Sequence, residues 1–198
     1  MKPFPTHTPP ARFLVIAGPS GAGKSTLIQR FLSGRPEVLR CLSVTTRAPR
    51  GQERDGVDYF FVSSEEFARR VAEGAFLEHA RVFGRHSYGT PRSYVEENLR
   101  AGRSVIKDVD VQGARQIQAS FPGSLTVFVV PPTRAEVERR LRGRGTEDAD
   151  SIARRLAEAD IELDAWREFG HLIINDDLDQ AAAELAAIFR ADQLRIFP

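Results

Sequence analysis

Cysteine is scarce in this sequence: Cys41 is the only one among 198 residues, so no disulfide can form within the chain. Long apolar runs are missing too, because stretches such as 13–17 and 126–130 fall far short of the ~18 residues that a membrane span needs. The first ten residues hold four prolines and no apolar core of a secretory signal, so we expect a disordered lead over residues 1–11. These scarcities favour a cytoplasmic protein with no membrane partner.

An excess of either charge sign is also lacking. The 28 Lys and Arg residues nearly balance the 27 Asp and Glu residues, for a net charge of +1 at pH 7. Dedicated nucleic-acid-binding proteins usually carry a strong basic excess, so we expect no nucleic-acid partner. What the chain does have is a hydrophobic fraction of 41%, enough to build the core of one ordinary domain. A monomer and a homo-oligomer are both left open.

Apolar segments typical of buried strands alternate with segments that have helical periodicity. We expect strands at 13–17, 59–62, 75–83, 104–109, 125–130 and 172–175. We expect helices at 24–32, 64–73, 111–119, 134–142, 149–167 and 179–192, and another with Thr90 as N-cap and Pro91 as first helical residue. Ser63 and Glu66 form a capping-box pattern for the second of these helices. The alternation predicts an α/β fold with a parallel sheet flanked by helices.

The strongest motif is the segment from Gly18 to Ser25, which reads G-P-S-G-A-G-K-S and fits the pattern G-x-x-x-x-G-K-[ST]. Its glycines let consecutive backbone N–H groups turn toward phosphate oxygens, and the helix N-terminus that follows adds unpaired donors. Lys24 can reach the β- and γ-phosphates, and the Ser25 hydroxyl can bind Mg²⁺. The context of strand before and helix after disfavours a plain connecting turn. We therefore predict ATP binding by Gly18, Pro19, Ser20, Gly21, Ala22, Gly23, Lys24 and Ser25.

Several further motifs, in order from about residue 12 to 195, resemble those of guanylate kinases. The most specific are T-T-R-A-P-R at 45–50 and D-V-D-V-Q-G-A at 108–114, and the others are G-V-D-Y-F-F-V at 56–62, F-L-E-H-A at 76–80, Y-G-T at 88–90, R-L-R-G-R-G at 140–145 and I-N-D-D at 174–177. The resemblance implies an enzyme that transfers the γ-phosphoryl group of ATP to GMP, and to dGMP as well, with Mg²⁺ as cofactor. It also implies one domain with a P-loop kinase core (12–41, 95–133 and 161–198), an inserted GMP-binding region (42–94) and a helical lid (134–160).

For the phosphate of GMP, the resemblance implies binding by Arg47 and Arg50, with hydroxyl donors from Tyr59 and Tyr88. Two guanidinium groups three residues apart can aim their paired N–H donors at one phosphate, which lysines would not reproduce. On spacing alone, the two arginines could equally belong to a solvated loop.

For the guanine base, the resemblance implies reading by the carboxylates of Glu78 and Asp110, with hydroxyl groups from Ser43 and Thr90. Guanine presents two adjacent donors, N1–H and the exocyclic amine, which a carboxylate accepts side by side. Adenine has an acceptor at N1 and would be repelled. From the alternation of strand 75–83 alone, Glu78 could instead lie on a solvated face.

The remaining residues that the resemblance implies concern ATP, Mg²⁺ and catalysis. Asp108 ends an apolar strand, where α/β folds place ligand-contacting groups, and we expect it beside Mg²⁺ with Ser25. The arginine-rich segment 134–155 would supply Arg140, Arg144 and Arg155 to the phosphates, while its other arginines solvate a helix face. Lys24, Arg47, Arg140 and Arg155 form the expected catalytic set, and Asn175 is expected to contact adenine. No general base is needed, because the acceptor phosphate oxygen is already ionised.

The sequence departs from the family pattern at two places. The segment between Gly84 and Tyr88 is one residue longer than usual, and Lys107 stands where the strand before the acidic motif normally carries an apolar residue. Lys107 could neutralise Asp108 or Asp110, or extend out of the sheet. Two other functions are alternatives to phosphoryl transfer to GMP. A binding module related to scaffold proteins is disfavoured by the intact phosphate loop, and a kinase for a ribose bisphosphate is disfavoured by Glu78, Asp110 and T-T-R-A-P-R.

Overall fold

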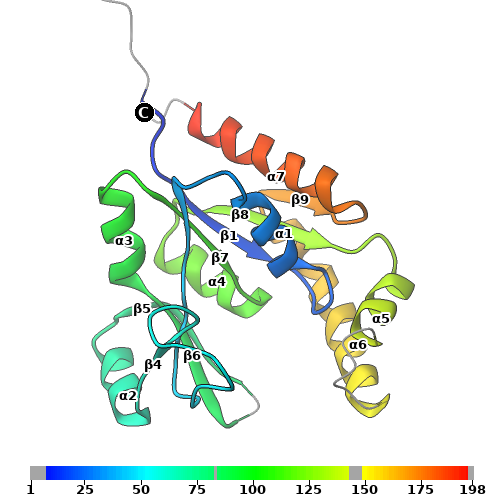
Figure 1. Cartoon of the computed structure of the whole chain (residues 1–198). Helices are drawn as coiled ribbons and strands as arrows, with labels where there is room; N and C mark the ends of the chain where they lie inside the picture. The colour runs from blue at the N-terminus through cyan, green and yellow to red at the C-terminus, as the bar shows by residue number, and fades with distance from the viewer. Residues whose placement is uncertain (1–7, 83, 143–148, 196–198) are drawn as a thin grey trace, which may run out of the picture.

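The computed structural model describes residues 8–82, 84–142 and 149–195. A five-stranded sheet in the order β2-β7-β1-β8-β9 forms the centre of the molecule, and every neighbouring pair in it is parallel (Figure 1). Its strands are β1 (Phe13–Ala17), β2 (Val38–Arg40), β7 (Ser104–Asp108), β8 (Leu125–Val130) and β9 (His171–Ile174). Helices cover both faces, so the predicted α/β fold with a parallel sheet is confirmed.

Strand β1 lies in the middle of this sheet, and all five of its residues are buried. Leu14 and Ile16 point to the face covered by α1 (Lys24–Leu32) and α7 (Leu178–Gln193). Phe13 and Val15 point to the opposite face, covered by α3 (Arg92–Arg100) and α4 (Val111–Ser120). A strand covered on both faces must be apolar throughout, which explains the uninterrupted sequence F-L-V-I-A.

A second, smaller sheet has the order β4-β3-β6-β5. Its strands are β3 (Val44–Thr45), β4 (Phe60–Phe61), β5 (Phe76–Val82) and β6 (His86–Pro91), and helix α2 (Ser64–Ala72) packs beside it. The ring of Phe67 in α2 stacks on the ring of Phe76 in β5 with 4.7 Å between centroids. Ser63 caps α2 as predicted, accepting a hydrogen bond from the Glu66 amide at 3.1 Å. This sheet positions most residues that were predicted to bind GMP.

One helix start was predicted wrongly. Helix α3 begins at Arg92 with Pro91 as its N-cap, so Thr90 is not a cap and Pro91 is not the first helical residue. Instead, Thr90 and Pro91 end strand β6, and the buried Thr90 hydroxyl donates to a carboxylate on β5. The Thr90 hydroxyl, which the local sequence predicted to cap a helix, thus bonds to a side chain on the neighbouring strand β5.

Two further helices, α5 (Arg134–Arg142) and α6 (Ala149–Leu163), pack against each other through Val137, Leu156 and Ala159. Helix α6 ends at Leu163 and a short 3₁₀ helix, η1 (Asp164–Glu168), replaces the last residues of the predicted helix. The α5–α6 pair and the smaller sheet extend from the same end of the central sheet, on either side of the loop between β1 and α1 (Figure 1). Within the described ranges, no helix combines the length and apolarity that crossing a bilayer requires.

Candidate active site

The loop between β1 and α1 has a backbone that requires glycine. Gly18 has φ of 142°, and a Cβ there would lie 2.1 Å from the carbonyl oxygen of Val129 in β8. Gly21 and Gly23 also have positive φ, at 83° and 84°. The segment from Gly18 to Ser25 therefore turns sharply out of the sheet and into the N-terminus of α1, the arrangement that binds phosphate with backbone N–H groups.

Side-chain hydrogen bonds hold this loop together and connect it to two other parts of the chain. The Lys24 ammonium donates to the carbonyl oxygens of Gly18 and Pro19 at 2.5 and 3.0 Å. The Asn175 amide, following β9, donates to the carbonyl oxygen of Ala22 at 2.8 Å. An Arg155 N–H of α6 lies 3.5 Å from the Ser20 hydroxyl. The predicted ATP residues on these elements are thus gathered at one end of the central sheet.

Arg140 of α5 belongs to the same neighbourhood. Its guanidinium donates to the backbone carbonyl of Asn175 at 2.9 Å and pairs with Glu136 at 2.6 Å. Other arginines of α5, including Arg134 and Arg139, form pairs with carboxylates on the helix surface, as the solvated-face interpretation expects. Arg144, which was also expected to contact ATP, lies outside the described residues.

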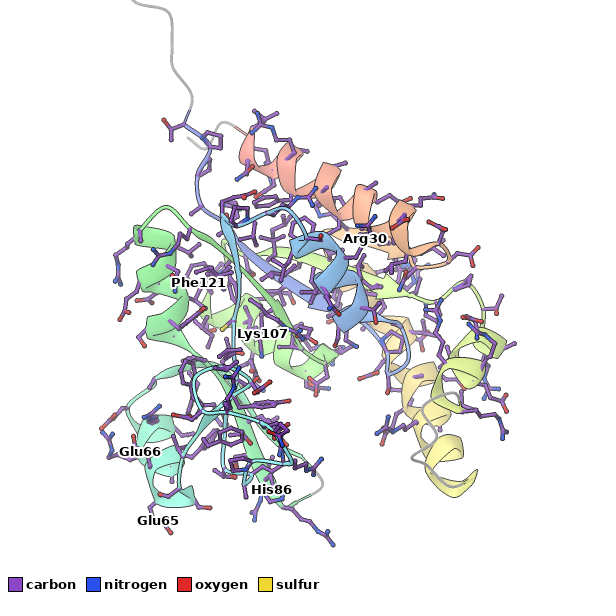
Figure 2. The ribbon with its side chains drawn as sticks, viewed as in Figure 1. Arg30, Glu65, Glu66, His86, Lys107 and Phe121 are labelled. Atoms are coloured by element: carbon purple, nitrogen blue, oxygen red, sulfur yellow. The ribbon has the colours of Figure 1, made fainter. Side chains whose placement is uncertain are left out.

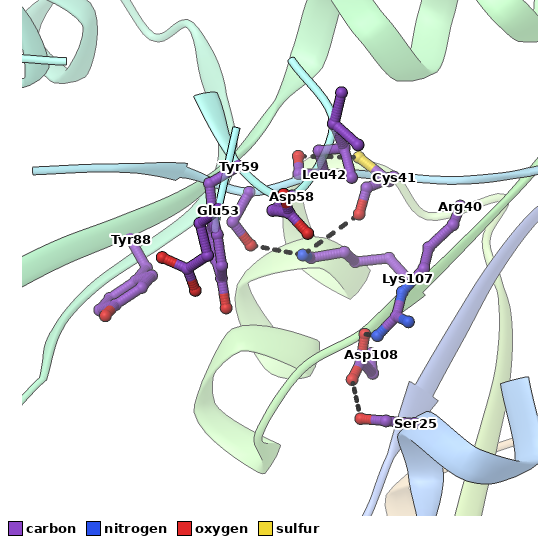
Figure 3. Close-up of a pocket in the computed structure, with 12 residues that line it drawn as sticks. Ser25, Arg40, Cys41, Leu42, Glu53, Asp58, Tyr59, Tyr88, Lys107 and Asp108 are labelled. Atoms are coloured by element: carbon purple, nitrogen blue, oxygen red, sulfur yellow. Dashed lines mark hydrogen bonds and ion pairs between the residues drawn. The ribbon is translucent and has the colours of Figure 1, made fainter. Parts of the chain in front are cut away.

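Ser25 and Asp108 meet at the ends of α1 and β7. The Ser25 hydroxyl donates to a carboxylate oxygen of Asp108 at 3.0 Å, and Arg40 lies 3.3 Å from the other oxygen (Figure 3). Burial raises the pKa of Asp108, but Lys107, Arg40 and the Ser25 hydroxyl outweigh burial and hold it below the ordinary value. An ionised carboxylate beside a hydroxyl is an oxygen donor set that suits Mg²⁺.

Arg47 follows strand β3 of the smaller sheet, and its side chain is only 6% exposed. Its guanidinium forms two hydrogen bonds to the carboxylate of Glu53, at 2.8 and 2.9 Å, and lies 5.2 Å from the centre of the Tyr59 ring. The rings of Tyr59 and Tyr88 are 6.1 Å apart. The Glu53 hydrogen bonds raise the pKa of Arg47, so this arginine is a fixed cation. Three of the four residues predicted for the GMP phosphate are therefore adjacent.

Glu53 is a site residue that the sequence analysis missed. Besides holding Arg47, its carboxylate accepts a hydrogen bond from the Arg50 backbone amide at 2.8 Å. The hydrogen bonds from Arg47, followed by that from Arg50, lower the pKa of Glu53. The Arg50 side chain itself is exposed. The signal available in the sequence was an acidic residue three positions after Arg50, because a carboxylate at that spacing can close a turn by accepting from a backbone amide.

Tyr88 joins this cluster although the segment before it is one residue longer than usual. The hairpin pairs Tyr88 with Ala80 on β5 and with Thr45 on β3. His86 begins strand β6 at the far end of the smaller sheet (Figure 2). The longer segment therefore leaves the Tyr88 ring facing Tyr59.

The predicted base-reading acids are also close together. Glu78 is 7% exposed and accepts a hydrogen bond from the Thr90 hydroxyl at 2.6 Å. Asp110 caps α4 by accepting from the Gly113 amide at 2.7 Å. A Cβ on Gly113 would lie 3.3 Å from a carboxylate oxygen of each acid, so glycine leaves room between them. Burial raises the pKa of Glu78, with the Thr90 hydrogen bond and Lys107 opposing that rise.

Ser43, the remaining predicted base contact, lies beside Lys107 in a cavity of about 410 Å³ (Figure 3). The Lys107 ammonium donates to the Ser43 hydroxyl at 2.5 Å and to the carbonyl of Cys41 at 3.4 Å. Lys107 is buried, so the alternative in which its side chain extends out of the sheet is wrong, and its charge lowers the pKa of Asp108, as the other alternative expects. The cavity also reaches Tyr59, Tyr88 and Asp108, and thus connects the tyrosine cluster beside Arg47 with the Ser25–Asp108 pair.

Comparisons with known proteins agree with this arrangement. A sequence model described as guanylate kinase matches residues 10–192. A guanylate kinase from Synechococcus sp. (strain CC9902) is 51% identical over 174 residues, covering 88% of this chain and 92% of that protein. One from Alkalilimnicola ehrlichii is 46% identical over 187 residues, covering 94% and 92%. The crystal structure of guanylate kinase from Anaplasma phagocytophilum superposes with a TM-score of 0.75 at 32% identity, covering 96% of this chain and 89% of that one. The chain belongs to the guanylate kinase family.

Proposed function

We infer that the protein is a nucleoside monophosphate kinase that transfers the γ-phosphoryl group of ATP to GMP, giving ADP and GDP. The observation that carries this function is a meeting of two sites at the carboxyl ends of adjacent strands. Ile16 of β1 lies opposite Asp108 of β7, so the phosphate loop that follows β1 starts beside the strand that leads into Asp110. A donor and an acceptor nucleotide bound there would have their phosphates next to each other, as in-line transfer requires.

At the ATP end, we propose that the backbone from Gly18 to Ser25 surrounds the β- and γ-phosphates. The Lys24 ammonium, which rests on two carbonyl oxygens of its own loop, would turn from them to the phosphates when ATP binds. Asn175 already uses its amide to hold the loop, so its role would combine support of the loop with contact to adenine.

A magnesium ion is the expected cofactor, and the residues present fit one. Ser25 and Asp108 supply hydroxyl and carboxylate oxygens. Among the described residues, no cluster of three or more His, Cys, Asp or Glu side chains could hold a metal ion alone, so the ion would share its ligands with phosphates and water. When bound, Mg²⁺ neutralises phosphate charge during transfer.

At the GMP phosphate, we propose that Arg47, Arg50, Tyr59 and Tyr88 supply the donors. Arg47 is held by Glu53 before any nucleotide arrives, so little of its side-chain entropy remains to be lost on binding. Arg50 is exposed, and it would close onto the phosphate from the rim.

At the base, we propose that Glu78 and Asp110 accept the N1–H and amine donors of guanine, with Ser43 and Thr90 completing the contacts. The Thr90 hydroxyl donates to Glu78 and so leaves the second carboxylate oxygen for the base. Both acids must be ionised for this role, and the raised pKa of Glu78 predicts weaker GMP binding in acid.

We propose that residues 42–94 form the GMP-binding region and 134–160 the lid, with the core at 12–41, 95–133 and 161–198. Arg140 and Arg155, joined by Arg144, would stabilise charge on the transferred group as the lid approaches the phosphates. Packing of α5 on α6 supports movement of the two helices as a unit. The single buried cysteine is compatible with the reducing cytoplasm, where we expect the enzyme to act.

The function is tested by measuring ADP release with ATP and Mg²⁺, using GMP, dGMP, AMP, CMP and UMP as acceptors. We expect rapid release with GMP and dGMP and background release with the other three. Comparable rates with AMP would contradict the proposed base site. Background rates with all five nucleotides, from folded protein that binds ATP, would contradict the proposed reaction.

A further inference from the structure

Lys107 is a buried cation at the centre of the candidate site, and apart from its effect on the pKa of Asp108 and Glu78 none of the roles described so far uses it. Strand β7 places Ile106 on the α1–α7 face and Lys107, one residue later, on the opposite face. The residue is 6% exposed, and it follows the fully buried apolar residues Val105 and Ile106 on β7. A buried ammonium costs several kcal/mol unless its N–H donors are satisfied, so its contacts are informative.

The contacts of Lys107 are neutral oxygens of the connection between β2 and β3. The ammonium donates to the Ser43 hydroxyl at 2.5 Å and to the Cys41 carbonyl at 3.4 Å. Within residues 8–82, 84–142 and 149–195, no carboxylate forms an ion pair with Lys107, and its third N–H has no hydrogen-bond acceptor. The Lys107 side chain lines the cavity of about 410 Å³, where a ligand could provide that acceptor (Figure 3).

The bond from Lys107 also fixes what Ser43 can do. An ammonium group has three donors and no acceptor, so the Ser43 oxygen must be the acceptor of this bond. The single hydroxyl proton of Ser43 is then left to donate to a different group. Ser43 and Lys107 together therefore present hydrogen-bond donors, whereas Glu78 and Asp110 present acceptors.

Guanine matches this pattern of donors and acceptors. Its O6 carbonyl is an acceptor, and it stands next to the N1–H and amine donors. Adenine has an amino donor in place of O6, which would face the donors of Ser43 and Lys107. We propose that Lys107 is a specificity-determining residue that, together with the Ser43 hydroxyl it fixes, binds the O6 carbonyl of GMP. The proposal rests on the proposed base site of Glu78 and Asp110.

An apolar residue at position 107 would act differently. Without the ammonium, the Ser43 hydroxyl can rotate and either donate or accept, so it discriminates less between a carbonyl and an amine. Lys107 removes that freedom. The lysine thus adds selection at the O6 side of the base to the selection that the acids provide at the N1 side.

The test compares GMP with 6-thio-GMP, in which sulfur, a weak acceptor, replaces O6 while both neighbouring donors remain. Binding to the full chain is measured by calorimetry without ATP, so that no reaction contributes. We expect the unaltered protein to bind GMP about tenfold more tightly than 6-thio-GMP. In Lys107→Met, which keeps side-chain length without charge, GMP binding should weaken about tenfold and the ratio between the two ligands should fall close to one.

Two controls separate this role from others. Arg40→Met removes a second cation that lines the cavity but is held by Asp108, so it should weaken both ligands alike and keep their ratio. Ser43→Ala should lower the ratio as Lys107→Met does, and the double variant should add little to either change. If the methionine variant fails to fold, Lys107→Leu provides the same comparison.

An unchanged ratio in a folded Lys107 variant would overturn the proposal and leave the kinase function untouched. Additive effects of the Lys107 and Ser43 substitutions would equally overturn it, because the two residues would then act independently. Failure of the unaltered protein to bind GMP at all would instead contradict the proposed function.

Discussion

Replacing Glu78 with glutamine tests the base-reading site, because it changes only one carboxylate oxygen into an NH₂ group and removes the negative charge. Glu78 is buried, and one of its oxygens already accepts from the Thr90 hydroxyl at 2.6 Å. In the variant, the amide either loses the Thr90 bond or directs its own N–H groups at the donors of guanine. The first orientation offers guanine a neutral amide oxygen in place of a charged acceptor, and the second places an N–H donor against the donors of guanine.

The expected loss follows from that geometry. A charge-assisted hydrogen bond contributes about 1.5–3 kcal/mol, so we expect GMP affinity to fall by about 2–3 kcal/mol, or roughly 30- to 150-fold. Stability should change in the other direction. Burial raises the pKa of Glu78, so the folded protein holds this proton more tightly than the unfolded chain and loses stability as the pH rises above the ordinary carboxyl range. Glutamine is neutral at every pH and does not suffer this loss of stability. At pH 7 the free energy of unfolding of the variant should therefore equal or exceed that of the unaltered protein.

The assay is calorimetric titration of GMP into Glu78→Gln, the unaltered protein and Glu97→Gln, an exposed control on α3. GMP affinity of the unaltered protein should decline as the pH falls through the raised pKa of Glu78, while that of the variant should show a smaller decline. Thermal unfolding at pH 7 checks that the fold is intact. Unchanged GMP affinity in a folded Glu78→Gln protein would show that the base binds elsewhere.

Three further substitutions address the phosphates and the loop. Lys24→Ala should reduce ADP formation to background while the melting temperature stays within a few degrees, and normal turnover would contradict the phosphate-loop assignment. Arg47→Lys loses the paired bonds to Glu53 and to phosphate, so the KM for GMP should rise about tenfold or more in steady-state assays, and an unchanged KM would count against its role. Gly18→Ala places a Cβ 2.1 Å from the Val129 carbonyl at a φ of 142°, and the melting temperature should fall by roughly 10 °C. A native melting temperature there would refute the close contact.

Four of the five strands of the central sheet could be predicted from sequence because their signals are local, whereas the short strand β2 was not predicted. The apolar run at 13–17 and the glycines after it fix a buried strand, a turn and a helix within 20 residues, and the structure has all three. Strand β6 gave no such signal, because H-S-Y-G-T-P contains glycine and proline, and Tyr88 and Thr90 are its only strand-favouring residues. It is a strand because β5 and β3 pair with it on both sides.

The residues of the candidate site also differ in whether the local sequence predicts them. The phosphate loop was predictable from residue types and spacing alone, whereas Glu78 and Asp110 depended on resemblance, because no local rule brings position 78 next to position 110. Glu53 and the contacts of Lys107 were not predicted. Each depends on a turn or a strand crossing that places side chains together in space, and the pattern along the chain does not encode such distances.

The position of β1 has a consequence for how the protein is made. Phe13 pairs with Val105, and Leu14 pairs with Leu125, so the first strand to leave the ribosome must wait for partners until more than half of the chain has been synthesised. During that interval, F-L-V-I-A is an uncovered apolar segment of high strand propensity, which is the kind of sequence that associates with other chains. The strand that gives the finished enzyme its nucleotide loop is therefore also the segment of the nascent chain with most need of protection.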